Sequence, residues 1–109
     1  MGKFEIKSDR TGKFIFNLKA SNGEVILTSS PYNTLSSCET GVWSVRRNSQ
    51  FEDNFKRSRT KDGNYFFKLL GGNLQVIGRS EVYTSKSSME NGILSVKTNA
   101  TEATLEKIF

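Results

Sequence analysis

The segment YNTLSSCETGVWSVRRN, residues 32–48, returns as YTSKSSMENGILSVKTN, residues 83–99, at an offset of 51 residues. Extending the comparison without a gap sets residues 2–49 on residues 53–100, and 16 of these 48 positions are identical. Self-similarity over nearly the whole chain indicates that one supersecondary unit has been duplicated. Two copies are too few for a solenoid, so we expect a closed pair related by pseudo-twofold symmetry.

Each copy opens with the pattern of three short strands. Residues 3–29 hold three runs in which apolar and polar side chains alternate, separated by turn signals at Gly12 and at Asn22-Gly23. Residues 54–80 repeat this arrangement, with Asp62-Gly63 at the first turn. The sequence therefore predicts a three-stranded antiparallel meander at the start of each copy.

An apolar stripe at i, i+4 and i+7 follows in each copy and indicates a short amphipathic helix. Gly41 and Gly92 lie within the stripe, and because glycine weakens a helix, we expect its backbone to approach the sheet closely there. We interpret Cys38 as a core residue and not a reactive thiol, because it aligns with Met89 inside the stripe. The stripe residues are Cys38, Val42 and Val45 in the first copy and Met89, Ile93 and Val96 in the second.

The ends of both helices also carry signals. Ser36-x-x-Glu39 and its copy at residues 87–90 match the capping box, in which a serine hydroxyl and a glutamate satisfy free backbone N–H groups. Asn48 and Asn99 are predicted to end the helices, because asparagine tolerates the left-handed conformation found there. We expect Trp43 to be buried beside the stripe and not to contact a ligand.

The connection between the copies is short. The first helix is expected to end near Asn48, and the next strand begins near Asn54, which leaves no room for a flexible linker. We therefore expect one domain over residues 1–109, built from repeats at 2–52 and 53–109. The chain would then be a monomer whose halves form an internal pseudo-dimer.

These features together resemble the YegP-like family of small bacterial proteins of unknown function. The resemblance rests on NGEVILTS at residues 22–29, on the tandem spacing, and on the tyrosine, helix and final asparagine kept in both copies. It covers residues 2–109 and implies an α+β fold. Two β-β-β-α-β units would share one antiparallel sheet, exchange their terminal strands, and pack both helices on one face. The family implies no catalytic or cofactor residues. The halves are not equivalent, because Arg57 stands in the place of Ile6.

Composition bounds the class of protein. The chain has 109 residues, a formal charge of +5, one cysteine and no histidine. A single cysteine excludes an intrachain disulfide and suits a reducing compartment. No stretch approaches the roughly 18 apolar residues of a membrane span, and MGKFEIKSDR lacks the apolar region of an export signal. We therefore expect a cytoplasmic protein with no membrane partner.

The pattern of reactive side chains favours a non-catalytic role. Without histidine, Cys38 and the serines lack the usual general base. The carboxylates do not show the spacing of metal ligands or of an acid–base pair. We expect no enzymatic activity, no cofactor and no metal, and hence an interaction or accessory module for an unidentified protein partner.

The basic residues indicate an alternative function, weak and sequence-tolerant binding of single-stranded nucleic acid. Strand alternation predicts Phe66, Lys68 and Arg79 on the sheet face away from the helices, with Arg57 and Arg59 on a nearby strand. An aromatic ring beside basic groups on an open sheet can stack bases. The same face is predicted to carry Ile15, Asn17, Lys19 and Ile26 from the first copy and Ile77 from the second.

Both basic features also have purely structural interpretations. Charges along the strand of Arg57 and Arg59 can protect an exposed sheet edge from pairing with other chains. Residues of the open face can pair across strands and bind nothing. The mild basic excess can serve solubility alone.

Overall fold

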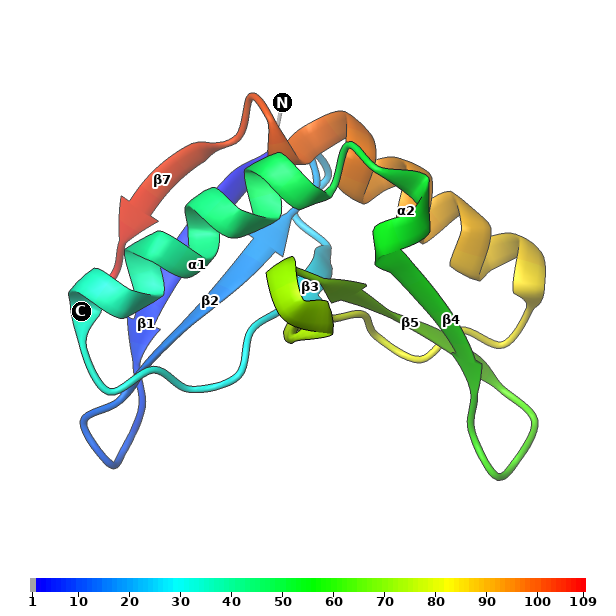
Figure 1. Ribbon diagram of the computed structural model, residues 1–109, viewed down its shortest axis with the longest axis horizontal. Coiled ribbons are helices and arrows are strands. Elements are labelled where there is room, and N and C mark those ends of the chain that lie inside the picture. The colour runs from blue at the N-terminus through cyan, green and yellow to red at the C-terminus, as the bar shows by residue number, and fades with distance from the viewer. Residues whose placement is uncertain (1) are drawn as a thin grey trace.

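The computed structural model describes residues 2–109, which form one seven-stranded sheet and two helices (Figure 1). All predicted strands and both helices are present. Single 3-10 turns at Glu52–Asn54 and Gly72–Leu74 precede β4 and β6. The elements in chain order are β1 (Lys3–Ser8), β2 (Phe14–Lys19), β3 (Val25–Thr28), α1 (Leu35–Asn48), β4 (Phe55–Arg59), β5 (Tyr65–Leu70), β6 (Val76–Arg79), α2 (Lys86–Ala100) and β7 (Thr104–Lys107).

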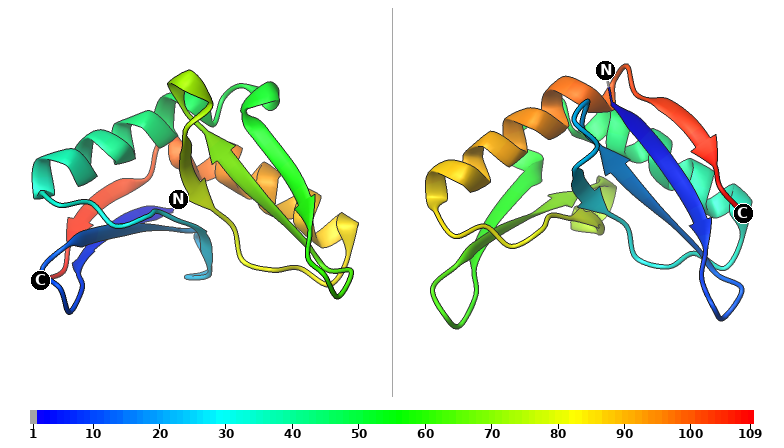
Figure 2. Two further views of the ribbon diagram at one scale, coloured as in Figure 1. Left: turned by 60° about the horizontal axis from the view of Figure 1, so that its bottom comes forward. Right: turned by 180° about the vertical axis from the view of Figure 1, so that it is seen from behind.

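The molecule has the shape of an arch. The β1–β2 hairpin forms one leg, the β4–β5 hairpin forms the other, and the two helices lie along the top (Figures 1 and 2). The strand order is β4-β5-β6-β3-β2-β1-β7, so the two meanders meet in the middle at β3 and β6. Their junction is narrow, with Thr28 paired to Arg79. The α+β class and the shared sheet are therefore confirmed.

The pairing of the terminal strands differs from the expected antiparallel exchange. β7 crosses to the first half and pairs with β1 in parallel, which makes the sheet mixed. β4 pairs with β5 of its own half. Because a tight turn with Gly63 at positive φ leads directly from β4 into β5, β4 is committed to the second half. The exchange is consequently one-sided, and the outer edges of β1 and β4 are not equivalent.

The core lies between the sheet and the two helices. α1 contacts β2 of its own half and β5 and β6 of the other, while α2 contacts β5 and β3. Burial of each large apolar side chain stabilises the fold by about 1.5–3 kcal/mol, so the helices bind the two meanders to each other. The cluster includes Phe4, Ile6, Phe16, Leu18, Leu27, Phe55, Phe67 and Leu69 from the strands and Cys38, Val42, Val45, Met89, Ile93 and Val96 from the helices.

Two register shifts move a pair of isoleucines off the predicted face. The pairing slips between Leu18 and Lys19 and at the matching place in the second half. Ile26 belongs to the hydrophobic core, and Ile77 packs against that core. An extra residue in one strand of a pair breaks the period-two alternation. The prediction that Ile26 and Ile77 lie on the open face was therefore wrong.

The helix caps lie two residues before the predicted serines. Thr34 Oγ1 accepts a hydrogen bond from the Ser37 N–H at 3.0 Å, and Ser85 caps α2 in the same way. Thr34 Oγ1 also donates to Ser37 Oγ at 2.8 Å. A hydroxyl pair thus replaces the expected serine–glutamate capping box, and Ser36 lies inside the first turn.

The helix-ending asparagines act through their side chains. Asn48 Nδ2 donates to the Ser44 carbonyl at 2.9 Å, and Asn99 donates to the Ser95 carbonyl at 2.8 Å. The residue after α1, Ser49, is right-handed with φ −66°. Neither Asn48 nor Asn99 has a positive φ, so the predicted left-handed conformation was wrong. α1 does end at Asn48, whereas α2 continues one residue past Asn99 to Ala100.

A tyrosine that precedes each helix explains the two helical glycines. A Cβ placed on Gly41 would collide with the hydroxyl of Tyr32 and lie 2.8 Å from its Cζ, and Gly92 meets Tyr83 at the same distance. The added Cβ atoms would also lie 3.0 Å from the Phe16 ring on β2 and 3.3 Å from the Phe67 ring on β5, so the predicted close approach to the sheet is confirmed. Trp43, by contrast, is 65% exposed, so the prediction of its burial was wrong. Its indole lies 5.4 Å from the guanidinium of Arg46 on the same helix.

Candidate functional site

The sheet separates the five residues predicted to bind nucleic acid into two groups. Phe66, Lys68 and Arg79 lie together, with the Arg79 guanidinium 4.2 Å and the Lys68 ammonium 5.9 Å from the centre of the Phe66 ring. The Arg57 side chain is on the opposite face, where it reaches α2. Strand alternation places Arg59 on the same face as Arg57. These five residues therefore do not form one surface.

The Phe66 ring is largely covered. It is 9% exposed, and the Arg79 guanidinium lies against it. A cation over an aromatic face is attracted by the negative charge density of the ring. A nucleobase could stack on Phe66 only after Arg79 moved away.

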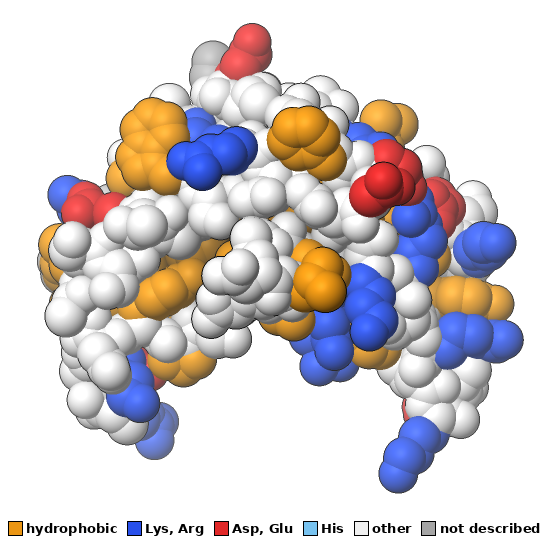
Figure 3. Space-filling model, viewed as in Figure 1, with side chains coloured by type: hydrophobic (Ala, Val, Ile, Leu, Met, Phe, Trp, Pro, Cys, Tyr) orange, Lys and Arg blue, Asp and Glu red, His pale blue; other side chains and the backbone are white. Residues whose placement is uncertain are grey.

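A row of cations crosses the second half of the open face, and the sequence alone did not reveal its full extent. Lys56 pairs directly with Lys68, and Lys68 with Arg79. We call these three residues the basic row. Figure 3 shows Lys and Arg side chains gathered on the half of the arch that holds β4 and β5. The first-half counterparts of the basic row are Glu5, Asn17 and Thr28.

The two halves of the open face therefore differ in electrostatic character. In the first half Glu5 is 6% exposed and contacts Lys19 at 2.9 Å and Lys3 at 3.3 Å. The Lys19 hydrogen bond is the main reason that the pKa of Glu5 lies below its usual value. In the second half like charges stand directly opposite one another, an arrangement that destabilises a sheet.

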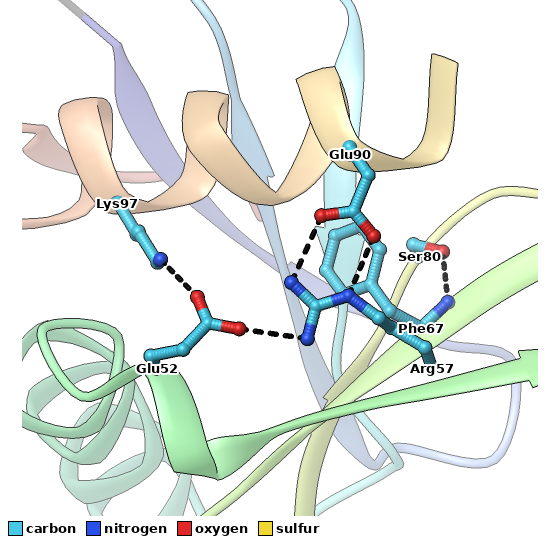
Figure 4. A network of polar contacts seen from close by, with 6 residues as sticks. All are labelled: Glu52, Arg57, Phe67, Ser80, Glu90 and Lys97. Atoms are coloured by element: carbon cyan, nitrogen blue, oxygen red, sulfur yellow. Dashed lines mark hydrogen bonds and ion pairs between the residues drawn. The ribbon is translucent and has the colours of Figure 1, made fainter. Parts of the chain in front are cut away.

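Arg57 holds β4 to its neighbours (Figure 4). Its Nε and Nη2 bind the two carboxylate oxygens of Glu90 at 2.6 and 2.9 Å, and its Nη1 binds Glu52 at 2.8 Å. Lys97 binds the other oxygen of Glu52. The hydrogen bond from Arg57 lowers the pKa of Glu90, and Glu90 in turn raises the pKa of Arg57. A bidentate pair of this kind fixes geometry as well as charge, which indicates a structural role for Arg57.

A basic cleft lies beside β4, between its edge and the start of α2. Its volume is about 490 Å³. The Arg59 guanidinium lies 4.8 Å above the Tyr65 ring and donates to the Gly63 carbonyl at 3.1 Å. We call this cleft, together with the outer side of β4, the edge cleft. Its lining residues are Arg57, Ser58, Arg59, Tyr65, Lys86 and Met89.

Two further clefts are related by the pseudo-twofold symmetry. One of about 420 Å³ lies between α1 and the turn at Gln75, and one of about 330 Å³ lies between α2 and Glu24. Tyr32 and Tyr83 stand at matching places in them. Some of the hydroxyl groups that line these clefts are already hydrogen-bonded within the protein. Thr40 Oγ1, for example, donates to the Ser36 carbonyl at 3.1 Å.

The one thiol of the chain is in the core, as predicted. Cys38 is 0% exposed, and burial raises the pKa of its thiol to about 11. A thiolate, and not a thiol, is the reactive nucleophile. Within residues 2–109 no three His, Cys, Asp or Glu side chains gather as a metal site would require. In the same part of the chain no helix is long and apolar enough to cross a bilayer.

The fold defines a class of small α+β proteins built by tandem duplication around one sheet. The chain belongs to the family described as Domain of unknown function (DUF1508), whose model matches it twice, over residues 9–54 and 60–106. The predicted resemblance is thereby confirmed. The relatives include UPF0339 protein MS1092 of Mannheimia succiniciproducens, 43% identical over 108 residues, 99% of this chain and 96% of that protein. UPF0339 protein YegP of Escherichia coli is 42% identical over 105 residues, 96% of each chain.

Two solution NMR structures have the same fold. The yegP protein from E. coli, described as a protein of unknown function, matches with a TM-score of 0.93 at 42% identity over 97% of this chain and 91% of that one. UPF0339 protein SO3888 from Shewanella oneidensis matches with a TM-score of 0.93 at 38% identity over 97% and 90%. The family and the fold are thus shown, while the names of the relatives assign no activity.

Proposed function

We propose that the protein is a non-catalytic interaction module that binds a protein partner at the edge cleft. The proposal rests on a difference between the outer edges of β1 and β4. The outer edge of β1 is covered by β7, whereas the matching edge of β4 has no strand beside it within residues 2–109. An unpaired edge with a cleft next to it is a ready site for another chain.

The state of the potential nucleophiles supports the non-catalytic part of the proposal. The Cys38 thiol is buried and its pKa is raised, which keeps it protonated at neutral pH. The buried serine hydroxyls are hydrogen-bonded to backbone groups. Ser29 Oγ accepts from the Phe16 N–H and donates to the Ser30 carbonyl, and Ser80 does the same one repeat later. These side chains therefore stabilise the fold instead of facing a substrate.

A capture experiment with two matched double variants tests the proposal. The protein is immobilised and exposed to native lysate as wild type, as Arg59→Ala/Lys86→Ala in the edge cleft, and as Lys68→Ala/Arg79→Ala in the basic row. Both variants lose two positive charges, so diffuse charge attraction changes equally. We expect a partner that is retained by wild type and by the basic-row variant and is lost by the edge-cleft variant. No enrichment over blank resin, or equal loss in both variants, would contradict the proposal.

A second candidate function, weak binding of single-stranded nucleic acid, is favoured by the basic row. Three cations in direct register weaken the sheet and so suggest an anionic partner on the open face. Phosphate contacts would supply most of the affinity, which would fall steeply with salt. Anisotropy of a short labelled oligonucleotide tests this function. Lys68→Ala with Arg79→Ala should reduce the salt slope, and Phe66→Ala should weaken binding only if bases stack there.

A further inference from the structure

We infer that the edge cleft receives an extended acidic peptide with a bulky apolar end, which pairs in parallel with β4 as β7 pairs with β1. This inference rests on the proposed function and specifies its partner. The chain itself provides the template, because the first repeat shows how a strand occupies this edge.

The contacts of β7 define that template. Lys3 pairs with Thr104 and Ile6 with Lys107, both in parallel. The Ile108 N–H donates to the Ile6 carbonyl at 2.9 Å. Beyond the strand, the Phe109 ring packs edge-on against Phe14, with 5.4 Å between ring centres. An occupant of this edge therefore needs backbone pairing over about four residues and a ring at its far end.

The second repeat has the same strand arrangement, but within residues 2–109 no strand occupies the outer edge of β4. One repeat later, Arg57 takes the place of Ile6 and Tyr65 takes the place of Phe14. The backbone of Ile6 faces β7, so by the same alternation the backbone of Arg57 faces outward from β4. The cleft of about 490 Å³ lies beside Tyr65. The Arg59 guanidinium lies over the Tyr65 ring, so the counterpart of the Phe109 ring would pack beside this pair. The Phe55 N–H is already used by the Glu52 carbonyl, so the available donors begin at Arg57.

Charge distinguishes the missing occupant from β7. In the first half Lys107 binds Glu39 at 2.9 Å. The counterpart of Glu39 is Glu90, whose two oxygens are already bound by Arg57. A lysine at this place of the peptide would find no free carboxylate, whereas an acidic residue would be attracted by Lys86 and Arg59, which line the same cleft.

The preceding peptide residue, at the place of Glu106, lies on the other face of the sheet and should be acidic as well. In the first half Glu106 pairs with Glu5, and Lys3 contacts both carboxylates, at 3.4 and 3.3 Å. The counterpart of Glu5 is Lys56, which is exposed. The peptide sequence that fits therefore has, in order, an apolar residue, two acidic residues, any residue and an aromatic residue, which correspond to residues 105–109 of the template. The chain's own C-terminal segment does not fit this pattern, because Lys107 would meet the cations of the cleft without a free carboxylate. Head-to-tail assembly of copies is therefore disfavoured.

The probe is a synthetic peptide of residues 103–109 carrying Lys107→Glu. Its binding to the full chain is followed by fluorescence anisotropy and by the backbone amide NMR spectrum. We expect shift changes concentrated on residues 55–59 and an affinity about tenfold or more above that of the unmodified tail peptide, because one like-charge contact becomes an attractive one. Absence of binding at millimolar peptide, equal binding of both peptides, or shifts confined to Lys68, Arg79 and their neighbours would overturn the inference.

Two substitutions at one residue separate backbone pairing from charge. Arg59→Ala removes the guanidinium, and Arg59→Pro removes in addition an N–H that strand alternation directs outward. We expect Arg59→Ala to weaken peptide binding by roughly tenfold and Arg59→Pro to weaken it further. Arg10→Ala, in the exposed turn after β1 on the other leg of the arch, should leave it unchanged. Equal affinities of Arg59→Ala and Arg59→Pro, both with native-like amide spectra, would exclude pairing along the edge. If Arg59→Pro does not fold, the shift map of the wild-type chain decides.

The peptide experiment and the lysate experiment test the two proposals separately. A partner captured through the edge cleft, together with no binding of the acidic peptide, would leave the proposed function standing and overturn the parallel-strand occupant. Loss of both signals would overturn both.

Discussion

Leu27 and Gly78 provide the sharpest test of how the two halves are joined. They occupy equivalent positions of the two repeats, on the strands that meet at the centre of the sheet. Leu27 is 0% exposed, and a Cβ on Gly78 would lie 2.6 Å from its Cγ and Cδ2. The leucine of one repeat therefore fills the space that the glycine of the other leaves open. We predict that the two residues are strongly coupled in stability.

The magnitudes follow from this contact. Leu27→Ala should lower the free energy of unfolding by about 3 kcal/mol, the usual cost of a cavity in a core. Gly78→Ala should lower it by about 1–2 kcal/mol, since the new methyl group overpacks a fixed side chain although alanine favours the strand slightly. In the Leu27→Ala background the added methyl group enters the cavity. The cost of Gly78→Ala should then vanish or reverse.

Urea unfolding followed by circular dichroism measures the four free energies. Fluorescence of Trp43 is the weaker probe, because its side chain is 65% exposed and its surroundings change little on unfolding. The double variant should be more stable than the sum of the single effects by at least about 1 kcal/mol. Additive effects within about 0.5 kcal/mol would show that the two strands are not packed against each other as described.

Three further predictions follow from the caps, the ion pairs and the duplication. Thr34→Ala should lower the free energy of unfolding by about 1 kcal/mol, whereas Ser36→Ala should change it by less than about 0.5 kcal/mol, as urea titrations would show. Because the pKa of Glu90 is depressed by Arg57, its contribution is present above its unfolded pKa of about 4.3 and is lost as pH falls through the folded value. Glu90→Gln should therefore reduce the acid-induced drop in urea midpoint, and an unchanged drop would contradict this. Residues 2–52 and 53–109 expressed separately should fold poorly or associate, and a well-dispersed monomeric NMR spectrum of either would refute the single-domain prediction.

The sequence predicts most of the fold because its signals are local and occur twice. Turn residues such as Gly12 and Gly63, which adopt φ of 82° and 85°, divide the strands where expected. The apolar stripes locate the helices because burial selects a 3.6-residue period. A duplicated pattern also strengthens every local signal, since each copy supports the other.

The errors arise where tertiary contacts override local patterns. The bulges that turn Ile26 and Ile77 toward the core depend on cross-strand register, which alternation within one strand does not reveal. The capping prediction failed because Thr34 and Ser36 both have suitable hydroxyls and only the chain path selects between them. Trp43 was misplaced because a helix has two flanks beside its apolar stripe, and the side that contacts the sheet is set by the packing.

The candidate site was predictable only in part. Alternation correctly grouped Phe66, Lys68 and Arg79, but it could not show that Arg79 covers the ring. The inequivalence of the two sheet edges depends on where β7 docks, a long-range event without a local signal. The replacements of Ile6 by Arg57 and of Ser8 by Arg59 were visible indications that the β1 and β4 edges differ.

Amide hydrogen exchange at Ile6 and Arg57 directly tests whether the outer edge of β4 is open while that of β1 is paired with β7. These residues occupy equivalent positions on β1 and β4, and the Ile6 carbonyl accepts from the Ile108 N–H. In a parallel ladder the same residue also donates its own N–H to the neighbouring strand. We expect the Arg57 amide to exchange at least about tenfold faster than the Ile6 amide in the free protein and to slow when the Lys107→Glu peptide is added. Equal protection of the two amides in the free protein, or no change at Arg57 with saturating peptide, would contradict it.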